Sequence, residues 1–118
     1  MPSTFSFVRQ VAFALPGVEE GLCHGTPALY VRRKLMARMW EDGETIVLKV
    51  EPTERARLFK REPDIYFLTD HYRNYPVMLM NLLAVRQDDL TRAVEGAWRF
   101  VASAKMVAAL DAARKGKR

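Results

Sequence analysis

The apolar positions along the chain change their period several times, and these changes predict a mixture of helices and strands. The chain opens with four apolar residues at helical spacing: Phe5, Val8, Ala12 and Leu15. Ser3 or Thr4 can cap this helix with a side-chain oxygen, and Pro16-Gly17 ends it. Residues 18–27 contain two glycines and a proline, so we expect a loop there.

A period of two follows and predicts a three-strand meander. The strands are expected at residues 28–32, 35–40 and 45–50. An Arg-Arg-Lys connection joins the first two, and Asp42-Gly43 is a strong two-residue hairpin signal between the last two. That turn pairs Met39 with Ile46 and Ala37 with Leu48.

Alternation divides the side chains of these strands between two faces of the sheet. The more apolar set is expected to face the core: Tyr30, Leu35, Ala37, Met39, Ile46, Leu48 and Val50. The opposite face is expected to carry Leu29, Val31, Met36, Arg38, Trp40, Val47 and Lys49.

The second half of the chain predicts two further helices around two strands. Pro52 suits the first turn of a helix that ends near Pro63. Strands are expected at residues 65–68 and 77–85. Asp88 or Asp89 can cap a last helix, which the Ala-rich residues 104–113 extend. Its apolar stripe is Leu90, Val94, Ala97 or Trp98, and Val101.

Strands clustered between helices in this order favour an α+β fold. We expect one domain over residues 1–113, with an antiparallel sheet of about five strands, helices packed on one face and the other face open. Residues 114–118 are expected to form a disordered basic tail.

Four stretches carry a resemblance to a known family: ALPGVEEG (14–21), GTPALYVRRKLMARMWEDGETIVLKVEP (25–52), FLTDHYRNYPVMLMNLLAV (67–85) and DLTRAVEGAWRFVA (89–102). They closely resemble the MmcQ/YjbR family of small bacterial proteins, over roughly residues 8–102. The most specific parts are Leu15-Pro16-Gly17, Gly25-Thr26-Pro27, Asp42-Gly43, and His71-Tyr72 through Tyr75-Pro76.

The resemblance implies a CyaY/frataxin-type fold, with helices on one side of an antiparallel sheet. It also implies the DNA-binding label that the family often carries, and it offers no catalytic residues to transfer. Relatives commonly have Gly, Trp and Arg where this chain has Asn74, Val77 and Asn81.

Composition indicates an ordinary globular protein, with 49% hydrophobic and 28% charged residues. No apolar run approaches the roughly 20 residues of a membrane span, so we expect no membrane association. The lone cysteine, Cys23, allows no internal disulfide. We therefore expect a cytoplasmic protein, and a monomer.

The net charge of +5 is concentrated at the C-terminus. From Lys105 onward there are five Lys or Arg residues and one acid, Asp111, a net of +4, which leaves +1 for residues 1–104. A body so close to neutrality argues against strong charge-driven binding to nucleic acid, and it is consistent with weak, salt-sensitive binding.

Three candidate sites for chemistry are weak. Cys23-His24 resembles a thiol–imidazole pair, but adjacent residues on an extended chain point apart. His71 with Asp70 could act as an acid–base pair or half of a zinc site, yet zinc needs three or four ligands and the only other histidine is His24. Iron would need carboxylates along an exposed helix, and residues 3–15 contain no acid. We predict no catalytic residue, metal ligand or cofactor.

Seven residues are predicted to form a binding surface: Arg38, Trp40, Lys49, His71, Tyr72, Arg73 and Tyr75. A tryptophan between two cations on an open sheet could stack a base, at ~1–3 kcal/mol each, or anchor a protein partner. Alternatively, a loop or the last helix covers Trp40. Residues 69–76 have turn chemistry in Asn74 and Tyr75-Pro76, and we interpret them as a connector whose polar tips line one rim of the surface.

Two functions follow. The first is a non-enzymatic binding domain that presents the open sheet and the 69–76 loop to a partner, a weakly held nucleic acid or a protein. The alternative is an enzyme or small-ligand sensor with a pocket near His24, His71 and Tyr72. An exposed strip of Arg38, Trp40 and Lys49 favours the first, and a deep cavity ringed by both histidines favours the second.

Overall fold

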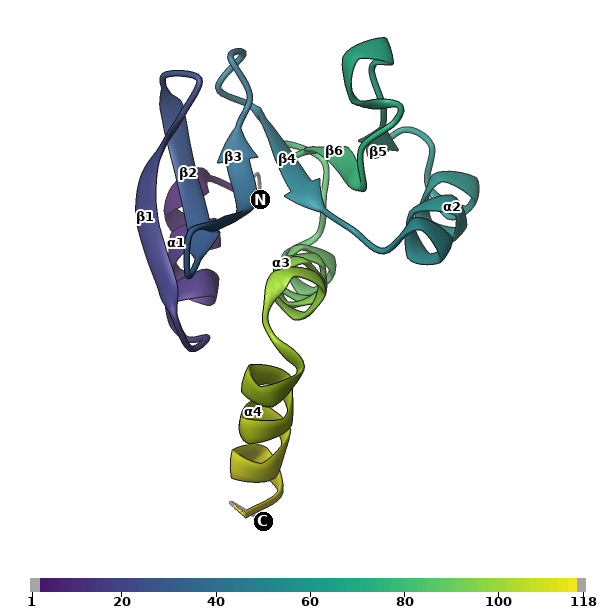
Figure 1. Ribbon diagram of the computed structural model, residues 1–118. Coiled ribbons are helices and arrows are strands. Elements are labelled where there is room, and N and C mark those ends of the chain that lie inside the picture. The colour runs from purple at the N-terminus through teal and green to yellow at the C-terminus, as the bar shows by residue number, and fades with distance from the viewer. Residues whose placement is uncertain (1–2, 117–118) are drawn as a thin grey trace.

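A six-stranded antiparallel sheet is the centre of the computed structural model, which describes residues 3–116 (Figure 1). The strands are β1 (Val18–Cys23), β2 (Thr26–Val31), β3 (Lys34–Met39), β4 (Thr45–Lys49), β5 (Tyr66–Phe67) and β6 (Val77–Asn81), in the spatial order β1-β2-β3-β4-β6-β5. The helices are α1 (Phe5–Phe13), α2 (Pro52–Arg61), α3 (Gln87–Val101) and α4 (Ala104–Gly116), with a 3-10 turn, η1, at Asp70–Tyr72. The predicted α+β class is confirmed.

Residues 18–23 form the edge strand β1, so the expectation of a loop there was wrong. The strand is possible because His24 and Gly25 make a two-residue turn, with φ of 53° and 79°, that pairs Cys23 with Thr26. Positive φ at both central residues matches the right-handed twist of the strands that such a turn joins. The sheet therefore has one strand more than the five expected.

The register predicted for β3 and β4 is confirmed, but the faces assigned to β2 and to the start of β3 were wrong. Ala37 pairs with Leu29, whereas Leu35 pairs with Tyr30, so Met36 is an extra residue between the two pairs. This bulge reverses the alternation on one side of it. As a result Leu29, Val31 and Met36 are buried in the core, and Tyr30 lies on the opposite face.

The helices α1, α2 and α3 all contribute to one core on a single side of the sheet, as expected. Thr4 caps α1 by accepting a hydrogen bond from the Phe7 backbone N–H at 3.3 Å. Pro52 opens α2, which ends at Arg61, with Glu62 as its C-cap before Pro63. Trp98 of α3 is fully buried, and its Nε1–H donates to the Pro16 carbonyl at 2.8 Å. This bond ties the end of the α1 segment to α3.

The strand expected over 77–85 is shorter, because β6 ends at Asn81. The Asn81 Oδ1 accepts a hydrogen bond from the Leu83 N–H at 2.9 Å, which closes a turn in place of a strand. Leu82 and Val85 remain buried and lead the chain toward α3.

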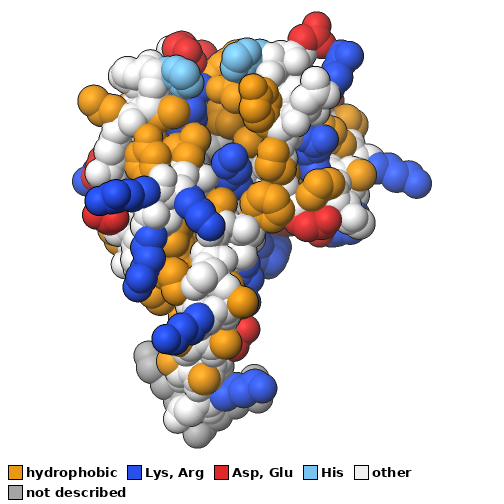
Figure 2. Space-filling view, viewed as in Figure 1, with side chains coloured by type: hydrophobic (Ala, Val, Ile, Leu, Met, Phe, Trp, Pro, Cys, Tyr) orange, Lys and Arg blue, Asp and Glu red, His pale blue; other side chains and the backbone are white. Residues whose placement is uncertain are grey.

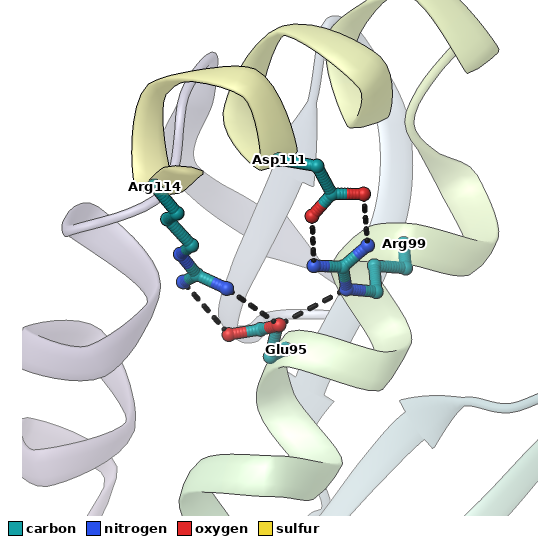
Figure 3. Close-up of polar contacts among 4 residues, drawn as sticks. All are labelled: Glu95, Arg99, Asp111 and Arg114. Carbon is teal, nitrogen blue, oxygen red and sulfur yellow. Dashed lines mark hydrogen bonds and ion pairs between the residues drawn. The ribbon is translucent and has the colours of Figure 1, made fainter. Parts of the chain in front are cut away.

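The C-terminal segment forms a separate helix, α4. A continuation of α3 followed by a disordered tail was expected there. The chain breaks at Ala102, whose ψ of 153° is extended, and α4 follows. Figure 3 shows how α4 is joined to α3. Arg99 binds Glu95 and Asp111, and Arg114 donates two hydrogen bonds to Glu95, at 3.0 and 2.9 Å. The expected tail boundary at 114 is therefore corrected for residues 114–116, while 117 and 118 lie outside the described residues.

The attachment of α4 is expected to weaken at acid pH. Hydrogen bonds from Arg114 and Arg99 lower the pKa of the Glu95 carboxyl, and the bonds from Arg99 lower the pKa of Asp111. Carboxyls with depressed pKa values stabilise the fold above their unfolded pKa, near 4, and this stability is lost as the pH falls through the lower folded values.

Glu95→Gln is expected to have the same effect at neutral pH. Amide hydrogens of α4 should exchange roughly 3- to 10-fold faster, because Glu95 links both arginines. Glu54→Gln is the matched control, since its carboxylate pairs with Arg57 within α2. Equal exchange rates of α4 in both variants would show that apolar packing alone holds the helix.

Candidate functional site

The second face of the sheet is closed by the segment after β5. Val47, Val77 and Leu79 are buried there in a small second core. Four partly buried side chains pack over it: Trp40, Phe67, Leu68 and Tyr72. The expectation of an open, flat face was therefore wrong over β4 and β6, because side chains of Trp40, of β5 and of the connector that follows β5 cover the apolar residues of these strands.

Arg38, expected to be exposed, is only 2% exposed and lies at the centre of this face. Its guanidinium donates from Nε to the Thr26 Oγ1 at 3.3 Å, from Nη1 to the Tyr72 Oη at 2.5 Å, and from Nη2 to the Glu41 Oε1 at 2.8 Å. One buried cation thus joins β2, β3, the β3–β4 turn and η1. We call Thr26, Arg38, Glu41 and Tyr72 the arginine cluster.

The charges in the arginine cluster compensate one another. Burial opposes the charge of Arg38, but the bonds to Glu41 and Tyr72 outweigh it and raise the pKa of the guanidinium. The bond from Arg38 lowers the pKa of the Glu41 carboxyl, with a smaller contribution from His24 nearby. The N–H groups of Arg38 donate to partners within the protein, so this arginine has a structural role. It is not a free cation for a ligand.

The 69–76 segment is built around three neighbouring rings that meet mainly edge-on. His71 meets Tyr72 edge-on, with ring centroids 4.7 Å apart, and Tyr75 lies 6.3 Å from His71 and 6.4 Å from Tyr72. Arg73 pairs with Asp70 at 2.5 Å, so Asp70 binds this arginine. Arg55 of α2 donates to the carbonyl of Tyr75 at 2.7 Å and fixes the end of the segment. The connector interpretation fits this geometry.

The remaining two predicted residues are both half-buried but differ in their contacts. Trp40 is half-buried and meets Phe67 edge-on at 6.4 Å, so its ring faces a neighbour. Lys49 is half-buried at the end of β4 and takes part in no ion pair among those found in residues 3–116. The predicted Arg38–Trp40–Lys49 strip therefore leaves one free cation, Lys49.

The two histidines are both exposed and stand near the arginine cluster, His24 beside Glu41 and His71 against Tyr72. Three cavities formed by described residues lie elsewhere, between α2 and α3, between α1 and α3, and beside the β2–β3 turn. None of these three is lined by a histidine. No group of three His, Cys, Asp or Glu side chains within residues 3–116 is placed to hold a metal ion.

Apart from Lys49, sequence reasoning missed a set of cations at the opposite end of the sheet. Arg32, Arg33 and Lys34 form and follow the β2–β3 turn, and all three are exposed. The antiparallel pairing of Ala37 with Leu48 places Lys49 at this same end. Lys105 of α4 lines one cavity of about 330 Å³ together with Arg32. We call Arg32, Arg33, Lys34, Lys49 and Lys105 the basic patch.

The cations of the basic patch have no ion-pair partner among the described residues, unlike many arginines elsewhere in the protein. None of the patch's five residues takes part in the ion pairs found within residues 3–116. Eight arginines do: Arg9, Arg38, Arg57, Arg61, Arg73, Arg92, Arg99 and Arg114. Figure 2 shows Lys and Arg side chains across this end of the face and along α4, with the acidic side chains near the margins. The adjacent pair Arg32-Arg33 was the sequence signal that could have revealed the patch.

Together, the helical layer on one face of the sheet and the covered second face define a small α+β domain. The YjbR family model matches residues 13–100, and the chain belongs to this family. No curated protein matches the chain. A crystal structure of the Deinococcus radiodurans protein DR2400, a DUF419 domain, is similar in fold: the TM-score is 0.73 at 20% identity, over 87% of this chain and 81% of that one. The CyaY/frataxin likeness stays a prediction.

No helix described in residues 3–116 is long and apolar enough to cross a bilayer.

Proposed function

We propose that this YjbR domain is a non-enzymatic binding domain that holds nucleic acid weakly, by its phosphates, at the basic patch. The observation that carries the proposal is the gathering of five cations without ion pairs at one end of the sheet. Cations already paired with carboxylates lose much of their attraction for phosphate, whereas free ones release condensed counterions when they bind. The sequence predicted a contact at the centre of the sheet. The proposal places it instead at the β2–β3 turn and the start of α4.

The geometry of the β2–β3 turn supports this assignment. Arg32 and Arg33 have φ of 47° and 76°, a left-handed conformation that costs side chains other than glycine about 1–2 kcal/mol each. Turns with positive φ at both positions favour Asn-Gly. Two arginines therefore occupy a place where they destabilise the fold, as residues kept for binding often do.

Exchanging this turn is expected to separate stability from binding. Arg32→Asn with Arg33→Gly should raise the free energy of unfolding by about 1 kcal/mol, measured by urea denaturation. The same variant should bind a labelled DNA duplex more weakly, with the salt slope falling in magnitude from about −4.5 to about −2.7 as two phosphate contacts of five are lost. A variant that is more stable but binds as well as the original would exclude the turn from the contact.

The rival small-ligand site has less support. His24, His71 and Tyr72 do gather around Arg38, but Tyr72 and Glu41 already occupy the guanidinium. A ligand there would have to displace the Glu41 carboxylate, and none of the three cavities opens at this position. We therefore assign the arginine cluster to holding the 69–76 segment on the sheet.

A further inference from the structure

A cavity of about 250 Å³ lies between α2 and α3, built from residues that the basic patch does not use. Its floor is apolar and consists of Val50, Leu58, Tyr66, Met78, Ala93 and Ala97. Its rim is charged, with Glu51, Glu54, Arg57, Arg61, Asp89 and Arg92. This combination of an apolar floor and a few polar groups is typical of small-molecule sites, and the volume lies just below the ~300 Å³ at which sites for drug-sized ligands begin.

The cavity exists because the two helices pack on different strands. α2 lies on β5 and β6, whereas α3 lies on β3 and β4. Gly96 of α3 lines the space between them, and a Cβ added at this residue would meet no atom within 4 Å. Alanine would therefore fit here and would favour the helix, since glycine is among the poorest residues in a helix interior. Because Gly96 lines the cavity without a side chain, we expect a bulky side chain at this position to occupy it.

Two polar side chains of the lining remain available to a ligand. Arg57 forms an ion pair with Glu54, and Arg92 forms one with Asp89. Each partner lies three residues away on the same helix. Arg61 has a looser partner, because its Nη2 lies 3.5 Å from the Glu62 Oε2.

Tyr66 is the second group and is 2% exposed. Burial, assisted by Asp89 and Glu62, raises the pKa of its hydroxyl, and the neighbouring Arg61 opposes this shift in part. The Arg61 guanidinium, which is held by this single long contact to Glu62, and the neighbouring phenol offer N–H and O–H groups suited to a carboxylate.

We propose that this cavity binds a small carboxylate with an apolar body. The apolar body lies on the floor near Met78 and Ala97, and the carboxylate accepts hydrogen bonds from Arg61 and Tyr66. A cavity of this size holds an aryl-acetate or a branched short-chain acid.

The test is a nuclear magnetic resonance titration of the full chain with phenylacetate and with 4-methylpentanoate. Saturable shifts are expected in the amides around Arg61, Tyr66 and Gly96, with a Kd of about 1 mM, as suits a ligand of so few atoms. Phenylacetamide, which has the same shape without the charge, should bind at least about fivefold more weakly.

Variants at two positions locate the site. Gly96→Phe should fill the cavity and abolish the shifts, while Gly96→Ala should keep them and raise the Tm by about 4 °C. Arg61→Gln should weaken the carboxylates about fivefold and leave phenylacetamide unchanged. Absence of saturable shifts with both acids up to about 10 mM, equal affinity for acid and amide, or shifts that persist in Gly96→Phe would each overturn the proposal.

Discussion

Replacing Lys34, Lys49 and Lys105 together with glutamine is expected to lower the affinity for duplex DNA about 500-fold at 0.1 M salt. If each cation of the basic patch contacts one phosphate, the slope of log K against log salt is about −4.5 for the original protein and about −1.8 for the variant. The two lines meet near 1 M salt, where counterion release contributes nothing, and they diverge by 2.7 logarithmic units for each tenfold dilution. Fluorescence anisotropy of a labelled duplex over a range of salt concentrations measures both slopes.

The chain offers a control with the same change in net charge. Lys60, Arg86 and Lys115 are exposed and take part in none of the ion pairs found in residues 3–116, but they lie outside the basic patch. Their replacement with glutamine should cost less than about tenfold in affinity, because only long-range attraction is lost. If both triple variants lose affinity alike, net charge and not the patch governs binding.

Among the polar residues of the predicted binding surface, Arg38 is expected to be the most costly to replace. Arg38→Met should lower the free energy of unfolding by about 2–3 kcal/mol. Methionine keeps most of the apolar stem but removes three hydrogen bonds, and it leaves Thr26, Tyr72 and Glu41 without their donor. Urea denaturation should show the loss as a lower midpoint with an unchanged slope. Hydrogen exchange should also quicken in the 69–76 segment, because Tyr72 is its polar attachment to the sheet.

Arg73→Met is the matched comparison for this expectation. Both arginines pair with an acid three residues away, but the Arg38 side chain is 3% exposed and that of Arg73 is 70% exposed. Exposed pairs contribute little, so Arg73→Met should change stability by less than about 0.5 kcal/mol. Equal losses in the two variants would mean that Arg38 is not the group that fastens the segment.

The sequence was most informative where local chemistry decides the structure. The cap at Thr4, the start of α2 at Pro52 and the pairing of Met39 with Ile46 each depend on residues close together in the chain. These features could be predicted because the sequence neighbours are also the structural partners.

Long-range packing decided the features that were wrong. The bulge at Met36 changes the face of Leu29 and Val31, and alternation alone carries no signal for it. Arg38 looked like a surface residue because its partner Tyr72 lies 34 positions away. The break at Ala102 and the return of Arg114 to Glu95 are also tertiary, so one continuous helix followed by a disordered tail was expected instead.

The candidate binding surface could be predicted only in part, for the same reason: its local contacts follow from the sequence and its long-range contacts do not. His71, Tyr72 and Tyr75 do lie together, because they belong to one short segment. The basic patch combines a turn, a strand end and the start of α4, and only the topology brings these together. Charge counted along the chain located an excess of cations after residue 104 but not their meeting with the β2–β3 turn.

Amide mapping with a short DNA duplex at low salt tests the central claim most directly. We expect the largest shifts at Arg32, Arg33 and Lys34, with smaller ones at Lys49 and Lys105, and little change around Arg38 and Tyr72. Shifts centred on the 69–76 segment, or none at any residue of the basic patch, would contradict the account.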